Sequence, residues 1–570
     1  MSALSDRLVR VLVRVDGEPA PLPAPLAAVE ALLLQGKFPE ALKSLSGGDG
    51  AAAFLEGAAR LALGDAPGAA KAAERAGAEP AAQAALRGVL AARAGDDGAA
   101  DAALSAAAAA APKRAWPWVL AASVLEARRD FAAADAALGR AVKIEPLGWI
   151  HAERARVREY LGVLPDAIAS AAAAIAVDPT PEHHRLKGEL HERWREHEKA
   201  AAEYARALKL APAEAGLSWL RARALSAAGD FPGALAAAGH TLRLAPEDEG
   251  FRAWTIQLRI VAGREKEAER ELAALLMDRK TGPSLRAQAA FLRAYLDMRR
   301  RRWSAARQGF EALSEGGGEG PFARKSSFYA ATCRVLEDGG PASAKERLVL
   351  AGLGVSPPYT ATAESVRLMA GATVLFNNVM GDEMFEFLRA LCPDARPIAY
   401  HQNGDEGRLS DEMMAAAVKK GARAVFVTRG SAIVYGPLGT ELMRRCVEKG
   451  LPCRALAAVS SADSILARLG ADEATRRGCA VADSGALDAP GWTDARIPLT
   501  AYVSFERGDG AFERFCSSAA AARGPESPCS VFDHVIGQEP LTWRVRELAE
   551  KKNALSVSAI AHFPAKEGTK

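Results

Sequence analysis

The chain has 570 residues, of which 25% are charged and 49% are hydrophobic, and its formal net charge is +3. This length exceeds what one hydrophobic core holds, so we expect two or more domains of ordinary globular composition. So small a net charge excludes a strong electrostatic preference for nucleic acid or for an anionic membrane.

Residues 1–27 are predicted to form a separate N-terminal segment. Arg7, Arg10 and Arg14 interrupt its apolar stretch, so we do not expect a secretory signal. Apolar runs elsewhere, such as AIASAAAAIAV, are rich in alanine and fall short of the roughly 20 residues of a membrane-spanning helix. The seven cysteines form no C-x-x-C pair, which disfavours zinc and disulfide frameworks and indicates a cytoplasmic location.

Residues 28–320 repeat one pattern. Units such as RDFAAADAALGRAVKIEP and HEKAAAEYARALKLAP contain a turn, an apolar helix with a period of about 3.6 residues, and a proline that stops it. Another helix precedes each unit. The prolines recur at intervals of 32 to 34 residues, at Pro80, Pro112, Pro146, Pro179, Pro212 and Pro246.

Two helices per roughly 34 residues, with alanines where the helices meet, resemble the tetratricopeptide repeat (TPR) in seven or eight imperfect copies. One helix pair cannot bury its apolar face alone, whereas a stack of pairs can, and such a stack forms a superhelix with a concave groove. We expect this groove to bind a protein or peptide partner. A spacer or a dimerisation arm is the alternative.

Two polar clusters lie in the repeats. The first is EHHRLKGELHERWREH, whose histidines do not have H-E-x-x-H spacing, so we expect a solvated helix face and not a metal site. Its histidines are His183, His184, His191 and His197. The second is DMRRRRW, residues 297–303, which is predicted to be an exposed helix end, with contact to an acidic partner as the alternative.

The sequence SEGGGEGP, residues 314–321, interrupts the repeats and is predicted to be a linker. Residues 321–346 are predicted to contain a helix, ARKSSFYAATCRVLEDGG, that caps the apolar end of the stack, and a link to the next domain.

From residue 347, short apolar runs alternate with amphipathic helices. The runs are RLVLAGLG, ATVLFNN, RPIAY, ARAVFVT and PCRALAAV. This alternation predicts a mostly parallel sheet covered on both faces, with ligands at the carboxyl ends of its strands. After about residue 478 the pattern becomes rich in strands, which predicts a second, smaller lobe.

The first strand ends at Gly352 and Gly354, which invites a dinucleotide interpretation. A dinucleotide-binding loop opens directly into a helix, but Pro357 and Pro358 occupy the region where that helix would begin. NAD binding is therefore disfavoured.

Three segments together resemble the tetrapyrrole methylase family in order and spacing across residues 347–565. They are LVLAGLGVSPPYTATAESVRLMAGATVLFNNV, GARAVFVTRGSAIVYG and KGLPCRALAAVSSADSILARLG. The resemblance implies two α/β lobes with S-adenosylmethionine in the cleft between them. It implies cofactor contacts at Gly352, Gly354, Gly430, Ser431, Ile433, Val434, Tyr435, Ser460 and Ser461.

Some of these residues have another interpretation. Ser460 also fits a helix-capping box with Asp463, and Tyr435 also fits a core aromatic at a strand edge. The sequence departs from the family at two places. Ser431 and Ala432 stand where the family has Asp-Pro, and Ala458 stands where it has glycine, which adds a Cβ where backbone approaches the cofactor.

Two further segments, AYHQNGDEGRLSDEM and TWRVRELAEKKNALSVSAIAHFPA, resemble the borosin branch of this family, which N-methylates peptide backbones. By this resemblance Arg408 would stabilise an imidate oxyanion and Tyr400 would help to remove the amide proton. A second catalytic tyrosine is absent, and Asp411 stands near its place.

The leading interpretation is a multidomain chain, with an all-α TPR-like superhelix followed by a two-lobed α/β tetrapyrrole methylase domain. It would transfer a methyl group from S-adenosylmethionine to a peptide or protein recruited by the repeats, and a homodimer is left open. One alternative is a catalytically impaired methylase-like domain in a TPR interaction scaffold. Another is a methyltransferase that acts on a tetrapyrrole precursor. No metal, nucleic acid or membrane partner is expected.

Overall fold

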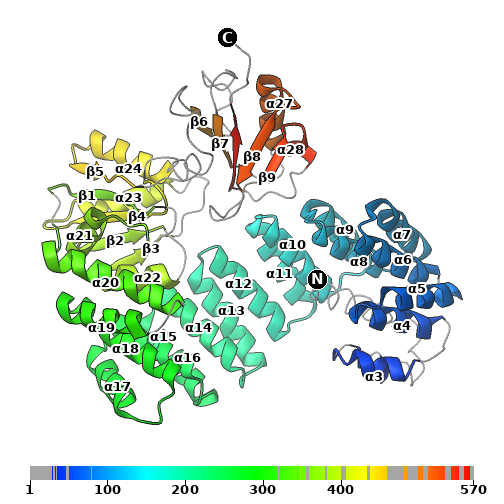
Figure 1. Ribbon diagram of the computed structural model, residues 1–570, viewed down its shortest axis with the longest axis horizontal. Coiled ribbons are helices and arrows are strands. Elements are labelled where there is room, and N and C mark those ends of the chain that lie inside the picture. Colours follow the sequence, from blue (N-terminus) through cyan, green and yellow to red (C-terminus); the bar gives the residue numbers. More distant parts are fainter. Residues whose placement is uncertain are drawn as a thin grey trace. The chain divides into compact units, whose positions relative to one another are not determined.

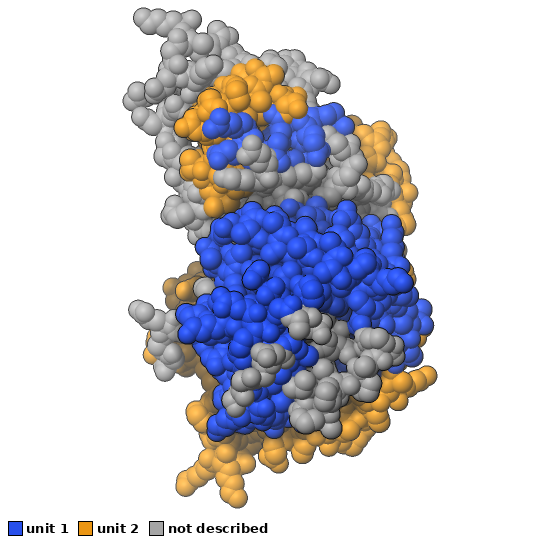
Figure 2. Space-filling model, turned by 90° about the vertical axis from the view of Figure 1, so that its right-hand side faces the viewer, with its two compact units in different colours: residues 1–190, 505–516, 546–558 blue, residues 191–504, 517–545, 559–570 orange. Residues whose placement is uncertain are grey.

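The computed structural model describes residues 28–29, 32–33, 35–45, 50–78, 80–316, 321–342, 345–354, 359–378, 382–398, 406–432, 437–458, 480–483, 499–504, 511–532, 541–550 and 558–564. The chain divides into two compact units, shown in different colours in Figure 2. The first unit comprises residues 1–190, 505–516 and 546–558. The second comprises residues 191–504, 517–545 and 559–570.

Helices occupy most of the chain from Phe38 to Gly339 (Figure 1). In the first unit they are α3 (Phe38–Lys43), α4 (Ala51–Ala62), α5 (Ala66–Arg75), α6 (Pro80–Ala94), α7 (Asp97–Ala110), α8 (Trp116–Ala127), α9 (Phe131–Ile144), α10 (Gly148–Tyr160), α11 (Leu164–Val177) and most of α12 (Pro181–Arg193). In the second unit they are α13 (His197–Leu210), α14 (Ala215–Ala228), α15 (Phe231–Leu244), α16 (Glu249–Val261), α17 (Glu265–Met277), α18 (Pro283–Arg299), α19 (Trp303–Gly316) and α20 (Pro321–Gly339).

The spacing of these helices confirms the predicted period. Alternate helices α9, α11, α13, α15 and α17 begin 33 or 34 residues apart, at Phe131, Leu164, His197, Phe231 and Glu265. Helices α9, α11, α13 and α15 end two residues before a proline, as predicted. Pro80 differs because it begins α6, a position where its missing N–H costs nothing. The assignment of these pairs to the TPR class remains a prediction.

The expectation of a solvated face for the histidine cluster was wrong. His183, His184 and His191 are only 6–8% exposed. Burial of these rings is tolerated because their ring nitrogens form hydrogen bonds within the protein. The His183 Nδ1 lies 2.6 Å from the Asp178 carbonyl oxygen, and the His191 Nδ1 lies 2.7 Å from a Glu196 carboxylate oxygen. Within the described ranges, no group of three or more His, Cys, Asp or Glu side chains could hold a metal ion.

A parallel sheet follows the helices. It consists of β1 (Leu348–Gly352), β2 (Val374–Asn377), β3 (Ala395–Pro397), β4 (Ala424–Thr428) and β5 (Cys453–Ala455), in the order β3-β2-β4-β1-β5. Every pairing in it is parallel. The helices between the strands are α21 (Ala363–Gly371), α22 (Asp382–Leu391), α23 (Glu406–Ala417) and α24 (Pro437–Glu448). The predicted alternation and the predicted parallel sheet are both confirmed.

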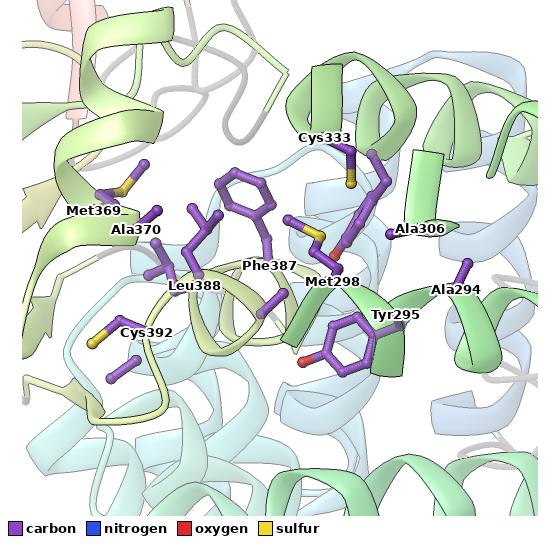
Figure 3. Close-up of a cluster of buried hydrophobic side chains, with 14 of the residues drawn as sticks. Ala294, Tyr295, Met298, Ala306, Cys333, Met369, Ala370, Phe387, Leu388 and Cys392 are labelled. Atoms are coloured by element: carbon purple, nitrogen blue, oxygen red, sulfur yellow. The ribbon is translucent and has the colours of Figure 1, made fainter. Parts of the chain in front are cut away.

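The sheet is covered on both faces, because its strands carry apolar residues toward both. One face, with Val349 and Val425, shares a core with helices α16 to α22. The opposite face, with Leu350 and Phe426, packs against α23 and α24. The first core is therefore continuous from the helical residues into the sheet, and Figure 3 shows Phe387 and Leu388 of α22 beside Tyr295 and Met298 of α18 within it.

Polar contacts accompany this shared core. The buried Glu386 of α22 accepts hydrogen bonds from Lys325 at 2.9 Å and Tyr329 at 3.2 Å, both in α20. Helix α20, which was predicted to cap the repeats, contacts α19 and also α21. It therefore joins the helices to the sheet.

The expectation of an exposed helix end at residues 297–303 is confirmed for Arg301 and Arg302, which are exposed after the end of α18, and was wrong for the residues before them. Asp297 is 8% exposed, and the Arg299 guanidinium donates to the Arg389 carbonyl oxygen at 2.8 Å. The Arg300 guanidinium donates to Glu265 at 3.0 Å and to Glu269 at 3.1 Å. These arginines make contacts within the protein because carboxylates of α17 and carbonyls of the sheet domain face them.

A second sheet confirms the predicted strand-rich lobe. Its strands are β6 (Ala480–Asp483), β7 (Leu499–Ser504), β8 (Pro528–Phe532), β9 (Leu541–Arg544) and β10 (Ser558–Phe563), in the order β6-β7-β10-β8-β9. A buried contact of 3.0 Å between Thr500 Oγ1 and His562 Nδ1 joins β7 and β10. The sequence did not predict the helices of this region, α27 (Ala511–Arg523) and α28 (Glu547–Glu550).

In the part of the chain that the structure describes, no helix combines the length and the apolar character needed to cross a membrane. The six cysteines in that part are free thiols. Burial raises the pKa of the Cys333 thiol to about 12, so this side chain behaves as an inert core residue.

Candidate functional site

The carboxyl ends of adjacent parallel strands meet at one edge of the first sheet. Strands β1 and β4 pair in register, with Gly352 opposite Thr428. Beyond them the Gly430 N–H donates to the Gly354 carbonyl oxygen at 2.8 Å, and the Gly354 N–H donates to the Gly430 carbonyl oxygen at 3.3 Å. We call residues 352–354, 430–432 and 458 the strand-end site.

Gly352 is required here by close packing. A Cβ at this residue would lie 2.2 Å from the Gly430 carbonyl oxygen and 2.6 Å from the Ala458 Cβ. Ala458 follows β5, the other neighbour of β1. Three strand ends therefore converge on Gly352, and the Ala458 methyl group occupies the space that a side chain of Gly352 would need.

Gly354 and Gly430 are required by backbone conformation. Their φ angles are +74° and +70°, in the left-handed region that favours glycine. At Gly354 a Cβ would lie 2.5 Å from the Thr360 Oγ1, and this hydroxyl donates to the Leu353 carbonyl oxygen at 2.7 Å. At Gly430 no atom of the described residues lies within 4 Å of the Cβ position. The backbone of Gly430 is thus open to close approach from one side.

The departure from the family at Ser431 and Ala432 has a packing explanation. Ala432 is 1% exposed and belongs to the core between the sheet and helices α23 and α24. A small apolar side chain suits this buried position. Ser431 is partly exposed beside Gly430.

The predicted catalytic arginine lies on a different element. Arg408 is exposed in the first turn of α23, which begins at Glu406. Asp411, which stands near the place of the missing tyrosine, is exposed and pairs with Arg445 of α24. The structure therefore gives Asp411 a role in joining two helices.

Of the residues implied by the family resemblance, the structure brings together Gly352, Gly354, Gly430 and Ser431. Arg408 lies apart from them on α23, and six residues lie outside the described ranges: Tyr400, Ile433, Val434, Tyr435, Ser460 and Ser461.

Asn377, which the sequence analysis did not select, is a polar residue at the end of β2. Asn377 is fully buried. The N–H of the neighbouring Asn378 donates to the carbonyl oxygen of Val427 in β4 at 2.9 Å. The signal available in the sequence was the pair of asparagines that ends the apolar run ATVLFNN. Such polar residues at the carboxyl end of a parallel strand are typical of ligand sites.

Arg195, in the turn between α12 and α13, was also missed. Its guanidinium donates to the Ile398 carbonyl oxygen after β3 and, at 3.4 Å, to the Asn378 carbonyl oxygen after β2. Burial lowers the pKa of Arg195 to about 10. A residue of the helical region therefore fixes the backbone at two strand ends, and no local sequence pattern could reveal a contact between such distant segments.

The backbone at Arg195 is unusual for its residue type. Most helix pairs have a left-handed glycine in the equivalent turn: Gly64, Gly95, Gly162, Gly229 and Gly263. The left-handed residues other than glycine are, within the described ranges, Arg129, Arg195 and Arg301. Arg301 donates to the Ala370 carbonyl oxygen of α21 at 3.3 Å. Arg195 and Arg301 thus contact the sheet domain from left-handed turn positions that glycine holds in most other pairs, and we call them the docking arginines.

Residues 347–534 match the family model described as Tetrapyrrole (Corrin/Porphyrin) Methylases. This confirms the family resemblance for this part of the chain, which contains a tetrapyrrole methylase domain. Residues before 347 lie outside the match, and the borosin branch remains a prediction. No curated protein matches the chain.

Solved structures provide further likenesses. Uroporphyrin-III-C-methyltransferase from Thermus thermophilus is 19% identical, with a TM-score of 0.31, over 39% of this chain and 93% of that chain. The methyltransferase CobJ is 13% identical, with a TM-score of 0.32, over 39% of this chain and 95% of that chain. Another structure of the Thermus thermophilus enzyme, complexed with S-adenyl homocysteine, is 23% identical, with a TM-score of 0.28, over 38% of this chain and 97% of that chain.

Proposed function

We propose that this protein is an S-adenosylmethionine-dependent methyltransferase that binds its cofactor at the strand-end site. The observation that carries the proposal is the backbone of Gly430, which pairs with Gly354 and has no described atom within 4 Å of its Cβ position, in a domain that matches the methylase family. Ligands of open parallel sheets bind outside the carboxyl ends of the strands, which is where this open backbone lies.

The residues present fit this cofactor. The Ala458 methyl group, which replaces a glycine of the family, packs against Gly352. The side chain of Ala432 is buried in the core. Neither departure therefore fills the open side of Gly430, where backbone and the Ser431 side chain would hold the cofactor.

The chemistry divides between the cofactor and the chain. When bound, S-adenosylmethionine supplies an electrophilic methyl group. The chain must bind and orient the acceptor and exclude water from it. For an amide acceptor, the guanidinium of Arg408 would stabilise the negative charge on the amide oxygen and Tyr400 would take the amide proton, because a neutral amide nitrogen is a poor nucleophile.

We further propose that the acceptor is a peptide or protein recruited by the helical region. Helices α16 to α20 share a continuous core with the sheet domain, and Arg195 connects the helical region to the ends of β2 and β3. An acceptor held by these helices would be carried by the same compact unit as the strand-end site. A tetrapyrrole acceptor, the alternative, would give no use to this large helical surface.

One observation favours a second candidate, a scaffold with an impaired methylase domain. Asp411 stands where the borosin resemblance leads us to expect tyrosine, and its carboxylate is engaged by Arg445. Such a protein would bind a partner through its helices without transferring a methyl group.

Incubation of the full-length protein with S-adenosylmethionine and candidate acceptors, followed by mass spectrometry, tests the proposal. We expect cofactor binding by calorimetry and a mass increase of one methyl group on a peptide. A methylated uroporphyrin-like macrocycle would instead support the tetrapyrrole alternative. Cofactor binding without any product would support the scaffold, and no cofactor binding would contradict the proposed function.

A further inference from the structure

A cavity of about 60 Å³ lies within the second unit, between helices α14 and α16 of the helical region and α22 of the sheet domain. Its walls include Arg223, Trp254 and Gln257 from the helical region and Phe385, Glu386 and Arg389 from α22. A single buried water needs only about 10–15 Å³ on this measure, so the cavity has room for a small ligand group.

Arg389 is the unusual residue of this cavity. It is only 7% exposed, and its guanidinium carbon lies 5.1 Å from the ring centre of Phe231 and 5.4 Å from that of Phe385. The guanidinium makes no hydrogen bond or ion pair with any residue that the structure describes. Burial lowers the pKa of Arg389, which reflects the cost of holding its charge away from water.

The other charged groups around the cavity do not neutralise Arg389. Glu386 is the acidic residue among the described wall residues. Its carboxylate accepts hydrogen bonds from Lys325 at 2.9 Å, Gln257 at 3.0 Å and Tyr329 at 3.2 Å. Arg223 is paired with Glu192 at 3.0 Å. The nearby positive charge of Arg299 opposes that of Arg389. An uncompensated positive charge therefore faces the cavity.

The shape of this cation indicates what it would bind. A guanidinium is planar and offers parallel N–H donors that match a carboxylate, and its face is already occupied by aromatic rings, which leaves its edge for a ligand. Trp254 and Phe385 provide apolar walls beside it. We propose that this cavity binds a carboxylate group, with Arg389 as its anchor. The carboxylate would come from a small organic acid or from an acidic side chain of a peptide.

This site is distinct from the strand-end site, and the proposal does not depend on methyl transfer. Calorimetric titration of the full-length protein tests it, with acetate, an N-acetylated glutamate tripeptide and inorganic phosphate as probes at constant ionic strength. We expect the two carboxylates to bind and the Arg389→Met variant to bind them about tenfold more weakly or worse. Arg389→Lys keeps the charge without the planar fork, so we expect intermediate binding.

Arg243→Met, which removes an exposed arginine of α15, is the matched control and should bind as the natural protein does. Circular dichroism verifies that each variant is folded, and Arg389→Met should not lower the melting temperature because it removes an unpaired buried charge. Tighter binding of the tripeptide than of acetate would identify a peptide as the source, and equal binding would identify a small acid. Carboxylate binding unaffected by Arg389→Met, equal binding of phosphate, or no binding of either carboxylate would overturn the proposal.

Discussion

At the scale of single residues, Gly352 shows how a glycine that resembles a ligand-binding residue can be needed for packing. Its missing side chain is what allows the Gly430 carbonyl and the Ala458 methyl group to meet beside β1. We expect Gly352→Ala to lower the free energy of unfolding by about 1–3 kcal/mol, because backbone must move to admit the Cβ.

Urea denaturation of the full-length protein measures this loss. Gly239→Ala in α15 is the control, since its new Cβ would have only the end of the Arg243 side chain within 4 Å. The free energy of unfolding of the control variant should rise by about 0.5–1 kcal/mol, because alanine is more favourable than glycine inside a helix. A Gly352→Ala variant as stable as the natural protein would contradict the close packing described here.

The sequence predicted part of the strand-end site. The motif resemblance selected Gly352, Gly354, Gly430 and Ser431, and the structure brings them together because they follow strands that are neighbours in the sheet. The steric role of Gly352 could not be predicted, because it depends on Ala458, which pairing of β5 with β1 brings close. Contacts of this kind arise from the order of the strands and leave no local pattern.

At the scale of elements, substitution of a docking arginine tests how the helices are joined to the sheet. Replacing Arg195 by glycine relieves the strain of its left-handed backbone conformation, but it also removes the guanidinium that donates to the Ile398 and Asn378 carbonyl oxygens. We expect the free energy of local opening at the strand ends to fall by about 1–3 kcal/mol, which would be seen as faster amide hydrogen exchange in β2 and β3.

Arg129→Gly is the matched control. Arg129 has the same left-handed conformation, with φ of +62°, but it is exposed and its side chain makes no hydrogen bond or ion pair with the described residues. This variant should be more stable by about 1 kcal/mol because only the strain is removed. Equal effects of the two substitutions would show that Arg195 does not support the strand ends.

An ion pair between the helices of the first unit gives a pH prediction. Asp135 of α9 accepts hydrogen bonds from Arg154 and Arg158 of α10, each at 2.8 Å. Burial alone would raise the pKa of Asp135, but these bonds hold it below the usual 3.8. A carboxylate whose pKa is lowered on folding contributes stability that is present above pH 3.8 and lost as the pH falls through the folded pKa.

We therefore expect Asp135→Asn to destabilise the protein at neutral pH. The loss of stability should become progressively smaller below about pH 4, where Asp135 of the natural protein is itself protonated. Thermal denaturation between pH 3 and pH 7 measures this difference. A cost that stays constant across this range would mean that the ion pair does not contribute through the charge of Asp135.

Element by element, helices were easier to predict than their surroundings. The proline spacing predicted the helix ends near residues 144, 177, 210 and 244 because each proline removes a backbone donor. Burial of the histidines on α12 was missed, since the polar partners that permit it, such as Glu196, lie on the following turn. Helix α27 was missed because its alanine-rich sequence lies among strands.

At the scale of the whole second unit, one core joins helices to sheet. Phe387 of α22 is fully buried, and its ring centre lies 5.2 Å from that of Phe328, in a tilted arrangement, and 5.9 Å from that of Tyr329, edge to face. Both partners belong to α20. We expect Phe387→Ala to lower the free energy of unfolding by about 3–5 kcal/mol. The loss should increase amide exchange in α18, α20 and the sheet together. Faster exchange confined to the sheet would show that the helices unfold independently.

The predicted boundary at residue 347 marks where the period of the sequence changes and where the family match begins. Periodicity reports local structure, and it carries no information on which apolar faces pack together. The continuity of the core across this position, from Tyr295 to Val349, therefore required the structure.

The central claim is that a cofactor binds against the open backbone of Gly430, and calorimetric titration of S-adenosylmethionine into two glycine variants tests it most directly. Gly430 and Gly421 flank the opposite ends of β4, with φ of +70° and +76°, and no atom in the described part of the chain lies within 4 Å of either Cβ position. Asparagine tolerates this conformation, so both substitutions should leave the protein folded. We expect Gly430→Asn to weaken binding about tenfold or more, by filling the open side, and Gly421→Asn to bind as the natural protein does. Equal binding by both variants would contradict the claim.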